Sequence, residues 1–117
     1  MPRKSPDIPS TDARRARILA VVRSLAPGEV ASYGEVARRA GFPRGARLAA
    51  RVLAANTDPD LPWHRVLRAD GRIAFAPNSR GYREQARRLR AEGVDVRQGR
   101  VRPPAAPRDL DALLWRF

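Results

Sequence analysis

One short segment, Leu61–Val66, contains the residue types with the most chemical potential in this sequence. It includes the only histidine, His64, with Trp63 before it and Arg65 after it. A histidine paired with a distant carboxylate such as Glu92 is a general acid–base unit in principle. No serine, threonine or cysteine stands beside His64 as an activated nucleophile, and an indole offers only one N–H donor. We therefore expect Trp63 to stack on a ligand or pack in the core rather than to react.

The composition predicts the kind of partner and excludes chemistry that depends on cysteine. The 117 residues include 24 Lys and Arg against 12 Asp and Glu, a formal net charge of +12, which predicts a polyanionic partner such as nucleic acid. Genomic composition is the alternative source of the arginine excess, because Ala and Pro are also abundant. Cysteine is absent, which excludes disulfides, thiolate metal sites and covalent transfer to a thiol. We expect no metal and no cofactor.

The sequence also predicts where the protein acts. No apolar run approaches the roughly 18 residues that a membrane span needs. The first residues, Met1–Pro6, lack the apolar core of a secretory signal. We expect a soluble, cytoplasmic, nucleoid-associated protein without a membrane partner.

Three helices are predicted ahead of Leu61–Val66, the recognition segment. Ser10 or Thr11 predicts the start of the first helix, and Pro27-Gly28 predicts its end. Ser32 and Glu35 match a capping box, in which Ser32 accepts from the Glu35 N–H and the Glu35 carboxylate reaches back.

A third predicted helix follows the turn Gly41-Phe42-Pro43. Its spacing predicts a buried face and an opposite basic face. The buried face is expected to hold Ala46, Ala49, Ala50 and Leu53, and the basic face Arg44, Arg47 and Arg51. Two short helices around a tight turn are typical of a helix-turn-helix, so we expect the basic face to contact DNA; the alternative is a merely solvated face.

The rest of the chain predicts a wing and a last helix. Asp70-Gly71 predicts a hairpin between residues 66–68 and 72–74. A later helix with Tyr82, Ala86 and Leu89 on one side is expected to end at Glu92-Gly93. The predicted fold is therefore mostly α with a small β element, a winged helix-turn-helix-like single domain.

The domain is expected to cover residues 10–96. Residues 1–9 are predicted to be a disordered basic arm. Residues 97–117 are predicted to be an Arg/Pro-rich linker with a short C-terminal amphipathic segment, Leu110–Phe117, that docks on the domain or binds a partner.

Several motifs in this range together resemble the C-terminal, DNA-binding domain of the O6-alkylguanine-DNA alkyltransferases. They are Gly28–Ala37, Gly41–Pro43, Ala46-Arg47, Asn56, Pro62–Val66, Gly71 and Glu92–Val94. That family carries Pro-Cys-His-Arg-Val, whose cysteine takes the alkyl group from the base. Tryptophan at that position, here Trp63, is typical of the alkyltransferase-like proteins, which do not accept an alkyl group. The resemblance implies the alkyltransferase C-terminal fold and no enzymatic activity.

The resemblance also implies how DNA is bound. Arg47 falls where the family inserts an arginine into the base stack, in the gap left by an extruded nucleotide. Tyr33 falls where a tyrosine contacts the target phosphate and the flipped purine. Arg44 and Arg51 would contact phosphates, and Asn56 would brace the turn after the recognition helix.

A lesion pocket is implied as well. It would consist of Tyr33, Pro62, Trp63, Val66 and Ser79, with Val66 and Ser79 acting through their backbone groups. His64 and Glu92, a proton relay in the enzymes, would be a structural remnant without a thiol. Asn78 departs from the tyrosine common in alkyltransferases, which implies a differently shaped pocket.

The resulting hypothesis is a monomeric lesion sensor. It binds double-stranded DNA, flips O6-alkylguanine into a pocket beside Trp63, transfers nothing, and marks the lesion for nucleotide excision repair proteins. The main alternative is a winged helix-turn-helix transcriptional regulator that binds undamaged DNA through the major groove. A His64-dependent hydrolase on nucleotides is a third class, for which the sequence offers neither nucleophile nor metal site.

Overall fold

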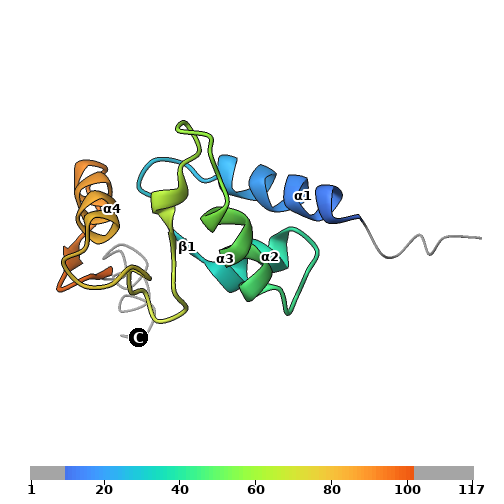
Figure 1. Ribbon diagram of the computed structural model, residues 1–117. Helices are drawn as coiled ribbons and strands as arrows, with labels where there is room; N and C mark the ends of the chain where they lie inside the picture. Colours follow the sequence, from blue (N-terminus) through green and yellow to red (C-terminus); the bar gives the residue numbers. More distant parts are fainter. Residues whose placement is uncertain (1–9, 102–117) are drawn as a thin grey trace, which may run out of the picture.

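The computed structural model describes residues 10–101, which form four α-helices and small β elements (Figure 1). The elements run in the order α1 (Thr11–Arg23), β1 (Ala31–Ser32), α2 (Tyr33–Arg39), α3 (Ala46–Ala54), the 3-10 helix η1 (Trp63–Arg65), β2 (Val66–Leu67), α4 (Arg80–Ala91), β3 (Val96–Arg97) and β4 (Arg100–Val101). The mostly α fold with a small β element is confirmed. The predicted arm 1–9 and the segment Leu110–Phe117 lie outside the described residues.

Serine side chains begin three of the helices. Ser10, Ser32 and Ser79 each accept a hydrogen bond from the backbone N–H three residues later, at 3.1, 3.0 and 3.3 Å. Each bond satisfies one of the N–H groups that the first turn of a helix leaves unpaired.

The capping box at α2 is only half formed. Ser32 acts as predicted, but the Glu35 carboxylate does not reach back to it. It binds Arg38 and Arg39 instead, each at 2.7 Å. Two guanidinium groups one turn along the helix outcompete a single backbone N–H for the same carboxylate.

The described part of the chain has two small hydrophobic cores. Figure 1 shows α1, α2 and α3 grouped together, with α4, β3 and β4 on the other side of the segment that contains β2. The first core includes Ile18, Val22, Val36, Ala37, Ala49, Val52, Leu61 and Val66. The second core includes Leu67, Ile73, Ala86, Leu89 and Val96.

Strands β1 and β2 join the two cores. They pair in parallel, with Ala31 opposite Val66 and Ser32 opposite Leu67. Successive side chains of a strand point to opposite faces. Val66 therefore lies in the first core and Leu67 in the second. Each core with its helices and strands forms one lobe, and the recognition segment ends where the two lobes meet.

The predicted hairpin between residues 66–68 and 72–74 forms only at its turn, where the Arg68 N–H donates to the Arg72 carbonyl at 2.9 Å. The turn at Gly71 exists, with φ of 85°, but β2 pairs with β1 instead. The backbone of Arg72 forms an antiparallel β-bridge with the backbone of Arg100, and the Ile73 N–H donates to the Gly99 carbonyl at 2.8 Å. Val66 and Leu67 pair with β1, which is far away in the sequence, and the residues of a local turn cannot predict such a pairing.

Ordered structure also continues past residue 96. Strands β3 and β4 form a hairpin, with Val96 opposite Val101 and Arg97 opposite Arg100. Gln98 and Gly99 between them have φ of 53° and 75°, the left-handed geometry that two-residue hairpin turns require. Residues 97–101 therefore belong to the domain and not to the predicted linker.

The buried face of α3 is rotated from the predicted one. Ala49 and Val52 are buried, Ala50 and Leu53 are half-buried, and Ala46 is exposed. The predicted apolar stripe is thus divided between the core and the solvent side of α3. None of the described helices is long and apolar enough to cross a membrane.

Candidate nucleic-acid interface and pocket

A cavity of about 510 Å³ opens between α3 and the segment that follows it. It is lined by Tyr33, Ala50, Leu53, Ala54, Asn56, Trp63, Ala74 and Phe75. The half-buried residues of α3 thus form one wall and Trp63 belongs to the facing wall. Its size and its apolar, aromatic lining with few polar groups are typical of a site for a small organic group. The lining offers no thiol and no aliphatic hydroxyl.

The Trp63 indole is held by its neighbours. The His64 ring lies perpendicular to it with centroids 6.1 Å apart, and the Phe75 ring meets it edge-on at 5.9 Å. The Arg88 guanidinium carbon lies 5.3 Å from its ring centroid. Edge-to-face and cation–π contacts restrain ring orientation. Trp63 is therefore a fixed wall of the cavity.

Phe75 is the site residue that sequence reasoning missed. It is 44% exposed, and it is the one large exposed hydrophobic side chain among residues 10–101. Its ring rests on Gly81 of α4, where a Cβ would come within 2.6 Å of it. Asn78 does not line this cavity, whereas Phe75 does, so the aromatic ring that faces Trp63 here comes from position 75. An apolar aromatic residue in a turn-rich loop is the signal that could have identified it.

Tyr33 contributes a hydroxyl to the cavity. It is the first residue of α2 and half-buried. Burial raises its pKa above the ordinary 10.0, so the hydroxyl stays neutral and can donate a hydrogen bond at physiological pH.

Asn56 braces the turn after α3, as predicted. Its side-chain oxygen accepts from the Asp58 N–H and its amide nitrogen donates to the Asp58 carbonyl, both at 3.0 Å. This closed local arrangement fixes the side chain where it borders the cavity.

His64, Arg65 and Glu92 form one largely buried polar cluster next to Trp63 in the chain. Glu92 Oε2 lies 2.8 Å from His64 Nε2 and 2.6 Å from Arg65 Nη2. Glu92 also accepts from the Gly28 N–H at 2.9 Å, and Arg65 donates to the Leu25 carbonyl at 2.8 Å. The cluster therefore ties the end of α4 to the loop after α1, across the two lobes.

The cluster has a defined protonation pattern. The Arg65 guanidinium, followed by the Gly28 N–H and His64, lowers the pKa of Glu92 from 4.5 to about 2. An ionised carboxylate only accepts, so the hydrogen between it and His64 lies on Nε2. His64 Nδ1 is buried and has no partner among the described residues. The pair predicted from the sequence is brought together, in a position where it orients η1.

Gln85 is a second residue that sequence reasoning missed. It is buried in α4, and its amide nitrogen donates to the carbonyls of His64 and Val66, both at 3.0 Å. These bonds fix the backbone on either side of Arg65. A polar residue on the apolar side of the last predicted helix is the signal that pointed to it.

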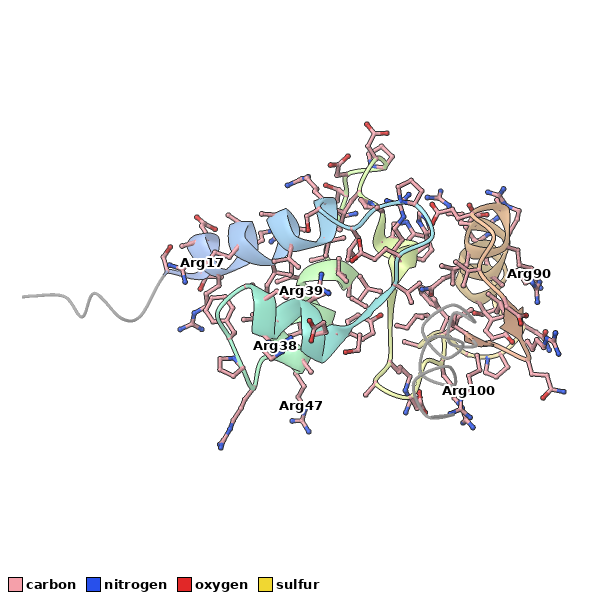
Figure 2. The ribbon with its side chains drawn as sticks, turned by 180° about the vertical axis from the view of Figure 1, so that it is seen from behind. Arg17, Arg38, Arg39, Arg47, Arg90 and Arg100 are labelled. Atoms are coloured by element: carbon pink, nitrogen blue, oxygen red, sulfur yellow. The ribbon has the colours of Figure 1, made fainter. Side chains whose placement is uncertain are left out.

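The basic face of α3 is exposed and unneutralised. Arg47 and Arg51 are on α3, whereas Arg44 lies in the turn before Ala46. All three are exposed, and none of them forms an ion pair within residues 10–101. Figure 2 shows Arg47 projecting away from the α2–α3 pair. By contrast, Glu35 binds the two arginines at the end of α2 and Glu84 binds two on α4. The first turn of α3 has no side-chain cap, so its N–H groups are free for a phosphate.

Three predicted pocket residues do not line the cavity. Pro62 borders a separate groove with Arg23 and Arg88. The side chain of Val66 is buried in the first core and the Ser79 hydroxyl caps α4, so the roles implied for their backbone groups stay predictions. Tyr33 and Trp63 are the two predicted pocket residues that the structure brings together there.

The chain is similar to proteins of one family. A family model described as the DNA binding domain of 6-O-methylguanine DNA methyltransferase matches residues 13–94. A DNA base-flipping protein of Vibrio parahaemolyticus is 36% identical over 81 residues, which is 68% of this chain and 79% of that protein. A methylated-DNA–protein-cysteine methyltransferase of Methanothermobacter thermautotrophicus is 40% identical over 81 residues, covering 68% of this chain and 44% of that protein.

The similarity extends to a solved complex with damaged DNA. Alkyltransferase-like protein 1 of Schizosaccharomyces pombe is 38% identical over 72 residues, 61% of this chain and 67% of that protein. The crystal structure of S. pombe Atl1 with DNA containing O6-carboxymethylguanine superposes with a TM-score of 0.70 at 29% identity, covering 82% of this chain and 93% of that one. With this fold, this domain match and Trp63 ahead of His64, the chain belongs to the 6-O-methylguanine DNA methyltransferase DNA-binding-domain family, as one of its alkyltransferase-like proteins.

Proposed function

We propose that this protein is a non-enzymatic sensor of alkylated DNA. It binds double-stranded DNA, rotates O6-alkylguanine out of the helix into the cavity beside Trp63, and leaves the alkyl group in place. The observation that carries the proposal is the cavity itself, which has an indole wall where the alkyltransferases have their cysteine.

The chemistry of the cavity supports binding without transfer. Alkyl transfer needs a thiolate or another activated nucleophile to attack the alkyl carbon. The sequence contains no cysteine, and Trp63 is locked against three neighbours. The His64–Glu92 pair has no thiol to deprotonate, so its role is to hold η1 and Trp63 in place.

The position of the basic helix supports base flipping. A base inside a duplex is inaccessible to a pocket, and extruding it costs a few kcal/mol. Arg47 is exposed and unpaired on α3, the same helix whose other residues line the cavity. Its planar guanidinium is suited to stack in the vacated position, while Arg44 and Arg51 bind flanking phosphates. Several relatives carry the name DNA base-flipping protein, which agrees with this arrangement.

The output of such a sensor is the persistence of its complex. Because no bond is made or broken, the lesion remains and the protein stays bound as a mark on the DNA. We propose that nucleotide excision repair proteins recognise this mark, and that the sensor acts as a monomer in the cytoplasm, associated with the nucleoid.

A transfer assay with binding tests the proposal. The protein is mixed with a duplex that carries O6-methylguanine with a radiolabelled methyl group. We expect a stable complex with all of the label on the DNA; label on the protein would refute non-enzymatic sensing. Arg47→Ala and Tyr33→Phe should weaken lesion binding for every flanking sequence, whereas a regulator would lose preference at one or two base pairs. Arg87→Ala, on α4, is the matched control.

A further inference from the structure

A second cavity lies beside the one described above and has a different character. Its volume is about 720 Å³, and Ala74 and Phe75 line both cavities, so a single loop separates them. Four arginines line it: Arg68, Arg72, Arg97 and Arg100. No carboxylate belongs to its lining.

The hairpin of β3 and β4 creates this cavity. Arg97 and Arg100 are on the hairpin, whereas Arg68 and Arg72 flank the turn at Gly71. The backbone β-bridge between Arg72 and Arg100 holds the turn at Gly71 next to the β3–β4 hairpin. The hairpin lies outside residues 13–94, the part that matches the family model. The arginine cavity is thus built partly from chain that the family match does not include.

The positive charge of this cavity is only partly neutralised. Asp70 and Asp95 pair with Arg72 and Arg97 at 3.7 and 3.1 Å, in exposed positions where ion pairs are weak. Arg100 donates from Nε to the Asp70 carbonyl, which is a neutral acceptor, at 3.1 Å. The Arg68 guanidinium has no hydrogen bond or ion pair within the described range.

We propose that this arginine cavity is a second phosphate-binding surface, which holds the backbone of the duplex to one side of the flipped nucleotide. It rests on the proposed function only in taking DNA as the ligand. Arginine forks match phosphate oxygens, and a backbone bound here runs one loop away from the pocket. Figure 2 shows Arg47 and Arg100 both toward the lower edge of this view, one from each lobe. The surface contributes affinity for any sequence and does not distinguish a lesion from a normal base.

The test is the salt dependence of binding to lesion-containing and plain duplexes of identical sequence. Each lost phosphate contact lowers the slope of log K against log salt by about 0.9. We expect Arg68→Gln and Arg100→Gln each to lower the slope by about that amount, and the double variant by about twice as much. The ratio of lesion to plain affinity stays at the wild-type value. Arg100→Lys, which keeps the charge, retains the slope, and Arg87→Gln on α4 is the control of equal charge loss.

Two results overturn the proposal: a wild-type slope in the double variant, or a loss no larger than that of Arg87→Gln. Arg68→Gln remains informative even if Arg100→Gln unfolds, because the Arg68 side chain makes no bond in the described range. Duplexes with the lesion near one end or the other add a second readout, since the effect should require a long flank on one side only. Loss of lesion preference in the wild type would refute the sensor, whereas the slope test would still report on this surface.

Discussion

Glu92 Oε2 lies 2.8 Å from His64 Nε2, joining the end of α4 to the residue that follows Trp63. In an enzyme with a thiol, such a pair can move a proton. Here the same carboxylate also binds Arg65 and the Gly28 N–H, so the end of α4, η1 and the loop after α1 converge on one largely buried charge. The His64–Glu92 pair has the geometry of a proton relay, and its role here is to hold η1 and Trp63 in position.

The first prediction concerns this carboxylate. Glu92→Gln keeps the shape of the side chain but leaves the Arg65 guanidinium without its counter-charge at a largely buried position. We expect the free energy of unfolding to fall by about 2–3 kcal/mol, measured by chemical denaturation. Glu84→Gln, which removes an exposed carboxylate bound to two arginines, should change it far less. Equal losses in the two variants would show that the cluster does not join the lobes.

The pH dependence of stability follows from the same contacts. The folded protein holds the pKa of Glu92 at about 2, below the ordinary 4.5. A lowered pKa means that the ionised form stabilises the fold; this contribution is complete above about pH 4.5 and disappears as the pH falls toward 2. The melting temperature of Glu92→Gln should therefore fall less steeply between pH 6 and pH 2 than that of the wild type; an unchanged pH dependence would contradict this assignment.

Gln85 provides a prediction about the backbone of the recognition segment. Gln85→Met preserves the volume of the side chain and leaves the carbonyls of His64 and Val66 without their donor. Burying unpaired carbonyls should cost about 1–3 kcal/mol, and lesion binding should weaken because η1 is no longer fixed. Arg87→Met, at an exposed position of the same helix, is the control. Unchanged denaturation and binding in Gln85→Met would mean that the two bonds are not formed.

Gly81 controls the position of Phe75. In Gly81→Ala the new Cβ would lie 2.6 Å from the Phe75 ring, so the ring must shift away from α4. The ring is exposed, so stability should change by no more than about 1 kcal/mol, while the preference for O6-alkylguanine over guanine should fall. Gly34→Ala is the matched control, since its Cβ would find no atom closer than 3.9 Å. A preserved preference in Gly81→Ala would remove Phe75 from the lesion pocket.

Local signals in the sequence predicted the helices well and the β pairing poorly. Helix starts depend on a serine and its neighbours, so the caps at Ser10 and Ser32 could be located from the sequence. The pairing of Ala31 with Val66 joins residues far apart in the chain, and strands of two residues leave almost no periodic pattern. The Asp70-Gly71 turn was therefore located correctly, but the parallel pairing of Val66 and Leu67 with β1 was not predicted.

The site was predictable where a motif defined it. Trp63, His64 and Tyr33 belong to motifs, and the structure places Trp63 and Tyr33 in the lining of one cavity, with the His64 ring perpendicular to the Trp63 indole. Phe75 is in an irregular loop and Gln85 acts through backbone carbonyls, so neither belongs to a recognisable pattern. The side chains of Val66 and Leu67 point to opposite faces of β2, so they enter different cores, and the motif alone does not predict which side chain enters which core.

The central claim is that the pocket beside Trp63 distinguishes an alkylated guanine from a normal one without reacting with it. The most direct measurement is a paired titration of the protein with two duplexes of identical sequence, one containing O6-methylguanine and one containing guanine, with the DNA recovered and analysed afterwards. We predict tighter binding to the modified duplex and recovery of O6-methylguanine unchanged. Equal affinities for the two duplexes, or conversion of the modified base to guanine, would contradict the account.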